Sequence, residues 1–575
     1  MKYYLNEKSS NNYMTDNLLR DILKTRGIID INEYCYPKGK YEEDYNNLAY
    51  IKEAVICLLK HIENNSRILV VVDCDVDGYT SAAALINYLK KNFKEINLTY
   101  KLHTGKQHGL TDDIIPIDDD VKLIIMPDAS SNDYSKHKEL KDRGIDIIVL
   151  DHHEAEKVSK NAIVVNNQLC DYRNKYLSGV GIVYKFLQAI DEELWRNDAE
   201  NYIDLVALGL IGDSMEVASL ETRYYIYKGL SNIKNKQLKA LLSKQEYSIK
   251  GKINMTNIAF YIVPLINAMI RVGKQEEKEL LFRGFVEEYQ EFDYKPRGAT
   301  ESTKEDIYTR AARLCANTKS RQDKLRNKAF DEVDNIIKLR NKVNDKILVV
   351  NCTNLVDNGL VGVVAIKIAD KYNRPCILLK KSDNDTFGGS GRNTDFNEVK
   401  DLKSILNKSE MFDLAEGHPQ AFGVKIKRDN IERFIKYANE ELNNIEFDGN
   451  TYCVDYIIPF EYLEDDFIAQ SESLSDYWGK GVSELKIAIT DIDLKSSEIK
   501  LLGKTKNTVK FNVDGIDFIK FQALNDELSV LAESGSEKDI KLEVVGRLST
   551  NEWNGKKTLQ IMVDDYNILQ YNEIK

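Results

Sequence analysis

The sequence predicts an α/β protein with a mostly parallel sheet, followed by a second α/β unit and a β-rich C-terminal region. From Arg67 onward, short apolar runs alternate with helical patterns, which is typical of a parallel sheet with crossover helices. The alternation begins again at Lys346. After Thr451 the helical patterns give way to short alternating strands. A chain of 575 residues is long enough for several such cores.

The composition places the chain among soluble globular proteins, since 43% of its residues are hydrophobic and 30% are charged. We find no apolar run near the roughly 18 residues of a spanning helix and no apolar signal segment at Met1. We therefore expect a cytoplasmic protein without a membrane partner. Eight scattered cysteines without a C-x-x-C pair argue against zinc ribbons and a disulfide framework. The net charge of -12 argues against indiscriminate polyanion binding, but leaves room for a local basic groove.

The patterns divide the chain into five predicted segments. The first sheet takes its strands from residues 67–72, 97–102, 121–126, 145–150 and 162–165, with helices over 79–91, 180–190 and 199–211. An amphipathic helix over 324–343 is expected to link two lobes. The predicted segments are an N-terminal helical segment (1–65), the first α/β domain (66–245), a helical connector (246–345), the second α/β domain (346–445) and a β-domain (450–575).

The C-terminal segment has the pattern of a small barrel or sandwich. Short strands are expected over 484–492, 498–502, 508–513, 519–524, 540–545 and 558–563. Asn554-Gly555 is a typical hairpin turn between the last two strands.

Three carboxylates at alternate positions, Asp73, Asp75 and Asp77, follow the apolar run at residues 67–72 and precede Gly78. Parallel α/β sheets bind ligands outside the carboxyl ends of their strands. Asp and Gly are also ordinary turn residues, but a turn does not require three alternating carboxylates. The triplet therefore indicates a site for metal or phosphate.

Later segments add further donors at comparable places. Asp128 and Asp151-His152-His153 follow strands, and Asp213 follows a helix. A set rich in carboxylates and lacking thiolates suits Mn²⁺ or Mg²⁺. So many donors from separate segments predict two ions, which makes phosphoester hydrolysis the natural chemistry. Neighbouring side chains at a strand end point in opposite directions, so one imidazole could bind metal while the other faces substrate. His61, His103 and His137 are interpreted as ordinary surface or core residues.

These motifs resemble those of the DHH phosphoesterase superfamily, and within it the RecJ-like exonucleases. The resemblance rests on Asp73-Cys74-Asp75-Val76-Asp77-Gly78, Asp128, Asp151-His152-His153 and Asp213, and continues through Ser178-Gly179, Arg271, Gly389-Ser390-Gly391-Arg392 and Gly417-His418. It implies a two-lobed fold, with a parallel-sheet DHH domain, a linking helix and a DHH-associated α/β domain, plus a C-terminal OB-fold barrel.

The resemblance also implies roles for individual residues. Six residues would form the metal site: Asp75, Asp77, Asp128, His152 and Asp213 as ligands, and Asp73 as a ligand or as a residue that supports one. Asp151 would orient the imidazoles, and His153 would contact the scissile phosphate or assist proton transfer. Arg271, Ser390, Arg392 and His418 would hold the DNA strand. Taken alone, the glycine-rich segments are more typical of turns, and Arg271 suits a carboxylate partner equally well.

Single-strand channels need backbone charge and stacking platforms. A basic segment offers such charge through Lys319, Arg321, Lys324, Arg326 and Lys328. The same residues could instead form an ordinary solvated helix face. Phe511, Phe518, Phe521 and Trp553 could stack bases or form the barrel core.

The resemblance therefore implies a 5′-to-3′ exonuclease specific for single-stranded DNA, active in DNA repair or recombination with two Mn²⁺ or Mg²⁺ ions. A single-strand-binding protein or a helicase is the expected protein partner, and the chain is expected to be a monomer. Two alternatives stay open. One is a DHH phosphodiesterase acting on short oligoribonucleotides or cyclic dinucleotides, and the other is a non-catalytic replication scaffold.

Overall fold

The computed structural model describes residues 1–105, 107–112, 114, 116–383, 385–447, 449–524, 526–534, 537–553 and 556–573. They form two compact units. The N-terminal unit contains residues 28–322 and 476–483. The C-terminal unit contains residues 1–27, 323–475 and 484–575, so the start of the chain belongs to it.

The N-terminal unit is built on a five-stranded parallel sheet in the order β3-β2-β4-β5-β6. Its strands are β2 (Arg67–Val72), β3 (Leu98–Leu102), β4 (Val121–Pro127), β5 (Asp146–Asp151) and β6 (Ile163–Asn166). The strand order reverses between β2 and β4. A topological switch point of this kind is where open α/β sheets bind their ligands.

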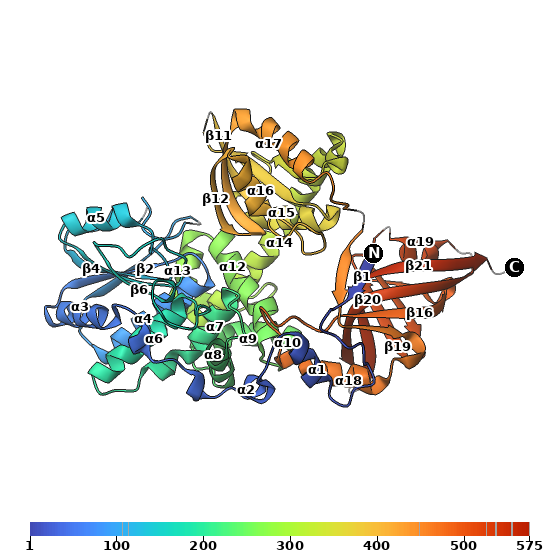
Figure 1. Cartoon of the computed structure of the whole chain (residues 1–575). Helices are drawn as coiled ribbons and strands as arrows, with labels where there is room; N and C mark the ends of the chain where they lie inside the picture. Colours follow the sequence, from blue (N-terminus) through green and yellow to red (C-terminus); the bar gives the residue numbers. More distant parts are fainter. Residues whose placement is uncertain are drawn as a thin grey trace. The chain divides into compact units, whose positions relative to one another are not determined.

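Helices cover both faces of this sheet (Figure 1). They are α3 (Ile51–Glu63), α4 (Val76–Asn92), α5 (Tyr134–Asp142), α6 (Gly179–Glu193), α7 (Ile203–Gly212) and α8 (Leu220–Ser231). Alternate residues of β2 face opposite sides, and Leu69 and Val71 pack with Leu140 of α5. Because both faces are buried, the strands are continuously apolar rather than alternating.

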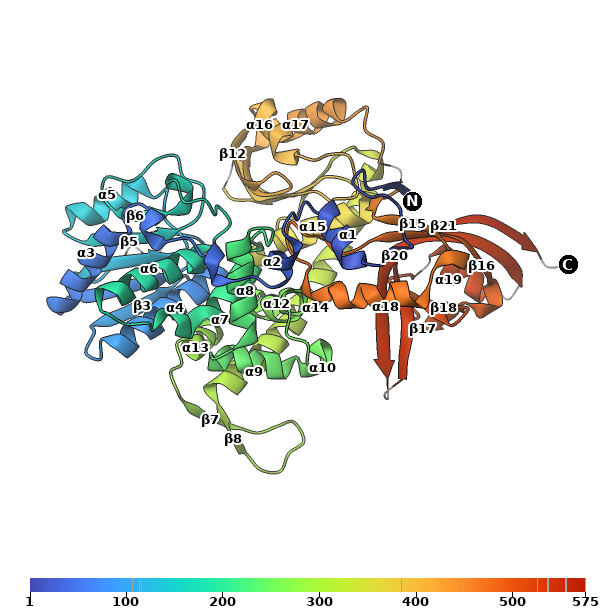
Figure 2. The same cartoon turned by 60° about the horizontal axis from the view of Figure 1, so that its bottom comes forward.

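Further helices and a hairpin complete the unit. The helices are α9 (Lys236–Lys244), α10 (Glu246–Ile249), α11 (Met255–Asn257), the π-helical turn η5 (Ile258–Ile262), α12 (Val263–Val272) and α13 (Gln275–Phe285). The hairpin of β7 (Glu291–Tyr294) and β8 (Thr303–Asp306) projects from the unit, as Figure 2 shows. The 33-residue helix α14 (Ile307–Leu339) then runs into the C-terminal unit.

The expectation that no apolar stretch approaches the length of a membrane-spanning helix needs correction. Among the described residues, the helical stretch Met255–Val272 is long and apolar enough to cross a membrane by those criteria alone. Half of this stretch is buried, as in a core helix of a globular unit.

The C-terminal unit contains a mixed five-stranded sheet in the order β12-β13-β11-β10-β9. Its strands are β9 (Leu348–Asn351), β10 (Cys376–Lys381), β11 (Thr386–Arg392), β12 (Phe412–His418) and β13 (Ala421–Lys427). Helices α15 (Val361–Tyr372), α16 (Leu402–Ser409) and α17 (Arg428–Glu441) accompany it. Only β9 and β10 pair in parallel.

A second, seven-stranded sheet in this unit has the order β15-β16-β20-β21-β19-β18-β17. Its strands are β15 (Tyr456–Pro459), β16 (Ile487–Lys495), β17 (Lys500–Leu502), β18 (Thr508–Val513), β19 (Ile516–Phe521), β20 (Lys538–Trp553) and β21 (Lys556–Glu573), and helices α18 (Asp465–Ser473) and α19 (Glu527–Glu533) join it. The expected hairpin residues Asn554 and Gly555 lie outside the described residues. Near the chain start, β1 (Lys2–Leu5) pairs in parallel with β14 (Thr451–Val454), and α1 (Leu18–Thr25) and α2 (Ile31–Cys35) follow.

The predicted fold class is confirmed, with several boundaries moved. Helix α4 begins at Val76 rather than Tyr79, because Asp75 caps it. The linking helix begins at Ile307, so the basic segment lies in its middle rather than at its start. Strands β20 and β21 are 16 and 18 residues long, about three times the expected length. None of the eight cysteines forms a disulfide, as expected.

Candidate metal centre

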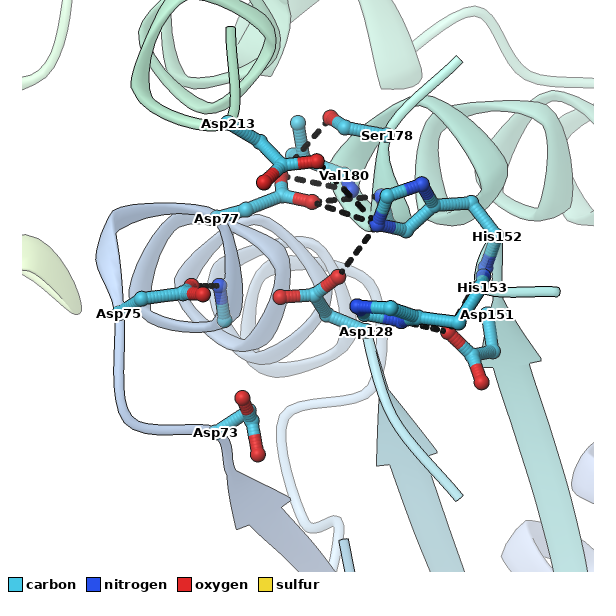
Figure 3. Close-up of polar contacts among 12 residues, drawn as sticks. Asp73, Asp75, Asp77, Asp128, Asp151, His152, His153, Ser178, Val180 and Asp213 are labelled. Carbon is cyan, nitrogen blue, oxygen red and sulfur yellow. Dashed lines mark hydrogen bonds and ion pairs between the residues drawn. The ribbon is translucent and has the colours of Figure 1, made fainter. Parts of the chain in front are cut away.

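The donors expected from the sequence meet at the carboxyl edge of the parallel sheet, beside the switch point (Figure 3). Asp73 follows β2, Asp128 follows β4, Asp151 ends β5, and Asp213 caps the end of α7. Each donor lies at the end of an element, so the packing of the sheet and helices fixes the donors relative to one another.

Asp77 is the most firmly held carboxylate of the triplet. It lies in the first turn of α4, is buried, and accepts hydrogen bonds from Ser178 Oγ (2.9 Å), Gly179 N (2.6 Å) and Val180 N (3.1 Å). These donors form the N-terminal end of α6, where backbone N–H groups favour an anion. Asp75, by contrast, caps α4 by accepting a hydrogen bond from Gly78 N at 2.9 Å.

Asp128 is buried at the centre of the site with a left-handed backbone (φ 67°). Such a conformation is costly for a non-glycine residue and is found most often at functional sites. A β-carbon at Gly179 would overlap Asp128, which explains the glycine that opens α6. Neither carboxylate oxygen of Asp128 has a hydrogen-bond partner among the described residues. A buried carboxylate without partners is costly unless a cation compensates it.

His152 faces the carboxylates. Its Nε2 lies 3.2 Å from Asp128 Oδ1, 3.4 Å from Asp213 Oδ2 and 3.9 Å from Asp77 Oδ2, yet it makes no hydrogen bond within the described part of the chain. Burial, with the neighbouring His153, lowers the pKa of His152 to about 4. The imidazole is therefore neutral near pH 7, which is the form that binds metal.

Two groups of donor atoms, each within 4.8 Å of one another, contain the six expected ligands. The first group contains Asp77, His152 and Asp213, and the second contains Asp73, Asp75 and Asp128. A further group places Asp151 and His153 with Asp128 and His152. The contact between His152 and Asp128 joins the first two groups. Each of the first two groups offers three donors to a divalent cation.

Burial raises the pKa of the carboxylates, and charge repulsion between them adds to several of the shifts. Burial raises the pKa of Asp213 to about 8, and the charges of Asp77 and Asp75 add to this shift. Burial also raises the pKa of Asp77 to about 6, with a contribution from Asp75, although the contacts of Asp77 with Asp128, Val180 and Ser178 act in the opposite direction. Burial and the same repulsion raise the pKa of Asp128 well above its usual range. A divalent cation would remove this repulsion, and the oxygen and imidazole donors fit Mn²⁺ or Mg²⁺.

Asp151 orients His153, and both residues lie next to Asp128 and His152. Its Oδ1 lies 2.8 Å from His153 Nδ1, and it also accepts hydrogen bonds from the backbone N–H groups of His152, His153 and Ser131. Burial alone would raise the pKa of Asp151, but these contacts lower it. Burial alone would lower the pKa of His153, but Asp151 raises it to about 9.

The expectation that the two imidazoles point in opposite directions is wrong. Strand β5 ends at Asp151, so strand alternation does not extend to His152 and His153, and their ring centroids lie 4.4 Å apart. The environments nevertheless differ, because the His153 side chain is 55% exposed and the His152 side chain 8%.

The sequence interpretation missed His108. His108 Nδ1 lies 2.5 Å from Asp73 Oδ2, and His103 Nε2 lies 3.8 Å from Asp73 Oδ1. Gly109 N also donates to Asp73, at 3.2 Å. His103 is buried and its Nδ1 lies 3.3 Å from Thr111 Oγ1, which agrees with the expected ordinary core residue. The only sequence signal for His108 was its position just after β3, next to β2 in the sheet.

Arg271, in the last turn of α12, belongs to the same unit. Burial lowers its pKa, while the charge of Asp75 acts in the opposite direction. It has no hydrogen bond or ion pair with any described residue. Its guanidinium is therefore not committed to a structural carboxylate, unlike Arg321, which contacts Glu277 at 3.1 Å.

The three expected contact residues of the C-terminal unit share one face of a sheet. Arg392 of β11 and His418 of β12 both lie opposite Ala421 of the strand between them, β13, so their side chains point to the same face of the sheet. Ser390 lies two residues before Arg392 on β11 and therefore shares that face. A β-carbon at Gly362, in the first turn of α15, would lie 2.7 Å from Arg392 Nη2. Guanidinium, hydroxyl and helix N-terminus together suit an anion.

The aromatic and basic candidates separate into different classes. Phe511 and Phe518 are buried and stack at 4.8 Å, so they belong to the core, whereas Phe521 is exposed. The side chain of Trp553 lies outside the described residues. On α14, Arg326 and Lys328 pair with Asp323 and Glu332, as in a solvated helix face.

Comparisons with known proteins agree with this architecture. Residues 67–210 match the N-terminal domain of the DHH family, and residues 454–565 match the RecJ OB domain. A prophage-derived protein of Bacillus subtilis that carries the name of a single-strand DNA-specific exonuclease is 40% identical over 558 residues, which are 96% of each chain. The chain belongs to the RecJ-like DHH family.

More distant relatives agree with this membership. The chain is 26% identical to the single-stranded-DNA-specific exonuclease RecJ of Bacillus subtilis. The match covers 90% of the chain and 63% of the Bacillus subtilis protein. The crystal structure of RecJ in complex with Mn²⁺ from Thermus thermophilus shares the fold, with a TM-score of 0.70 and 18% identity over 98% of this chain and 79% of that one. Family membership makes the RecJ-like chain a metal-dependent nuclease.

Proposed function

We propose that the protein is an exonuclease that removes nucleotides from the 5′ end of single-stranded DNA with two Mn²⁺ or Mg²⁺ ions, in DNA repair or recombination. The observation that carries the proposal is the pair of adjoining donor groups. They meet where the carboxylate oxygens of Asp128 and the Nε2 atom of His152 lie buried without a hydrogen-bond partner among the described residues. The relatives named for single-strand-specific exonuclease activity support the choice of substrate.

In this proposal Asp77, His152 and Asp213 hold one ion, and Asp73, Asp75 and Asp128 hold the other. Two such ions, when bound, activate water and stabilise the attacking and leaving oxygens at phosphorus. The start of α6 keeps Asp77 oriented through three hydrogen bonds. Gly179 leaves room for Asp128.

The histidine next to the donor groups has a separate role. Asp151 keeps His153 protonated near pH 7 and fixes the orientation of its ring. The exposed imidazolium can then donate a hydrogen bond to a phosphate oxygen of the substrate. Asp151 acts through His153 and is a positioning residue.

Each unit by itself offers cationic or polar groups that can contact the backbone of single-stranded DNA. Arg271 supplies an uncommitted guanidinium in the N-terminal unit. Ser390, Arg392 and His418 supply a hydroxyl, a guanidinium and an imidazole on one sheet face of the C-terminal unit. Groups of these kinds bind phosphate without reading the base, as an exonuclease that does not depend on sequence requires.

One assay tests substrate, polarity and mechanism together. The full chain is incubated with Mn²⁺ and with single-stranded DNA labelled at the 5′ or the 3′ end, duplex DNA, and RNA dinucleotides. We expect single-stranded DNA alone to be shortened, with immediate release of a 5′-labelled mononucleotide. Preferential cleavage of RNA dinucleotides would favour a small-substrate phosphodiesterase. Binding without cleavage of any substrate would favour a scaffold.

A further inference from the structure

A cysteine thiol lies beside the metal centre, in a place that the proposed nuclease mechanism does not use. Cys74 stands between two carboxylates of the triplet and is buried. Its Sγ lies 3.8 Å from His108 Nε2 and 3.9 Å from His108 Nδ1. Asp73, Cys74 and His108 each offer a donor atom within 4.8 Å of the others.

The three donors differ in kind from those of the two groups that we assign to Mn²⁺ or Mg²⁺. A set of thiolate, imidazole and carboxylate is typical of Zn²⁺ and other borderline or soft ions, whereas Mn²⁺ and Mg²⁺ prefer oxygen. Sulfur and nitrogen donors of a tetrahedral Zn²⁺ ion lie about 3.6 Å apart, as follows from bond lengths of about 2.3 and 2.0 Å. The observed separation of 3.9 Å between Sγ and Nδ1 is close to that value.

The site also has a route of entry and the freedom to adjust. Asp73 is buried, but the His108 side chain is 50% exposed, so an ion can approach from the solvent beside it. The present 2.5 Å contact between His108 Nδ1 and Asp73 Oδ2 would widen by about 0.8 Å around an ion. The exposed imidazole can make this movement, while Asp73 stays held by Gly109 N.

We propose that Asp73, Cys74 and His108 form a third metal site, selective for Zn²⁺ or a similar thiophilic ion, next to the two hydrolytic ions. On binding, the Cys74 S–H bond is replaced by a sulfur–metal bond, and the proton shared by His108 and Asp73 is displaced. Both protons pass to the solvent. The ion takes Asp73 away from the donor group that contains Asp75 and Asp128.

This sharing of Asp73 has a regulatory consequence that rests on the proposed function. A thiophilic ion in the third site would weaken the binding of the neighbouring hydrolytic ion, because that ion loses Asp73 as a ligand. Zn²⁺ would therefore inhibit the Mn²⁺-supported nuclease. Removing the thiol would make the nuclease less sensitive to Zn²⁺. Because the binding itself does not depend on hydrolysis, it can be tested separately.

The deciding experiment is a Co²⁺ titration of the full chain, followed by the near-ultraviolet charge-transfer band that only a cobalt-bound thiolate produces. We expect the band in the wild type, its loss in Cys74→Ser, and at least tenfold weaker apparent Co²⁺ binding in His108→Gln. Cys57→Ser is the matched control, because Cys57, His61 and Asp146 form another group with a thiol, an imidazole and a carboxylate within 4.8 Å. The band should persist in that variant.

The proposal would be overturned if the band persists in Cys74→Ser or is absent from the wild type. Loss of the band only in Cys57→Ser would place the thiolate site on α3 instead. Circular dichroism of each variant distinguishes a lost ligand from a lost fold. The Mn²⁺ nuclease assay, run without Co²⁺, tests the proposed function independently, so the two failures cannot be confused.

Discussion

The donor groups of the N-terminal unit and the contact face of the C-terminal unit contrast in burial and in partners. Asp77 and Asp128 are fully buried, and neither oxygen of Asp128 has a hydrogen-bond partner in the described structure. Ser390 and Arg392 are half-buried, His418 is exposed, and Ser390 Oγ donates to the backbone of Phe422. The first region is electrostatically incomplete without a cation, whereas the second is stable as it stands. We therefore assign chemistry to the first region and strand binding to the second.

The largest expected effect comes from Asp128→Asn, which should separate the two roles. Removing one central donor should lower kcat by at least about 10²- to 10³-fold, while binding of single-stranded DNA stays within a factor of two. Single-turnover cleavage and fluorescence anisotropy measure the two quantities. Asp204→Asn is the control, because Asp204 is equally buried but accepts hydrogen bonds from Lys234 N and Asn235 N. A fully active Asp128→Asn variant would refute the site assignment.

Asp151→Asn should have the next largest effect. Loss of the carboxylate that orients His153 should lower kcat about 10- to 100-fold. It should also move the alkaline limb of the pH–rate profile to lower pH, since Asp151 is what raises the pKa of His153. A purely structural role for Asp151 would reduce the rate without moving that limb.

Arg392→Ala should produce the complementary defect in the C-terminal unit. Loss of a charge-assisted contact to phosphate should raise KM about tenfold and leave the Mn²⁺ dependence of kcat unchanged. Arg433→Ala removes the same charge from an exposed helix position of that unit, and we expect a change of less than twofold. Equal effects in both variants would mean that net charge, rather than the β11 face, binds the strand.

The smallest effect is a pH dependence of stability in the metal-free protein. The pKa of Asp213 is raised to about 8 and that of His153 to about 9, so between pH 6.5 and 8 the folded state binds more protons than the unfolded state. His152 acts in the opposite direction near pH 6.5, because its pKa is lowered to about 4 in the folded state while the unfolded imidazole is about half protonated, but this single contribution is smaller than those of Asp213 and His153 together. The melting temperature in chelator should therefore fall as pH rises from 6.5 to 8, and Asp213→Asn should reduce the slope. A melting temperature that rises over this range would contradict the electrostatic account.

Sequence patterns predicted which donors the structure brings together, because most of those donors stand at the ends of apolar strands. The end of a parallel strand fixes both the sheet edge and the neighbourhood of a residue, so Asp128 and His152 could be placed together without a structure. The contacts of Asp77 with the start of α6 could not be anticipated, because they join segments 100 residues apart in the chain.

His108 was missed for a similar reason. It follows β3 in an irregular segment, and its contact with Asp73 depends on how that segment folds back over β2. Aromatic residues of the C-terminal sheet were also ambiguous, since the same alternation places Phe518 in the core and leaves Phe521 exposed. Whether such a residue can stack on a base depends on burial, which strand periodicity alone does not give.

The central claim is that two adjoining donor groups hold two ions. The most direct test is Mn²⁺ binding to the full chain by equilibrium dialysis, combined with electron paramagnetic resonance of the loaded protein. We predict two Mn²⁺ ions per chain with an exchange-coupled spectrum, as expected for ions about 3.5–4 Å apart. A single Mn²⁺ per chain with an isolated-ion spectrum would contradict the account.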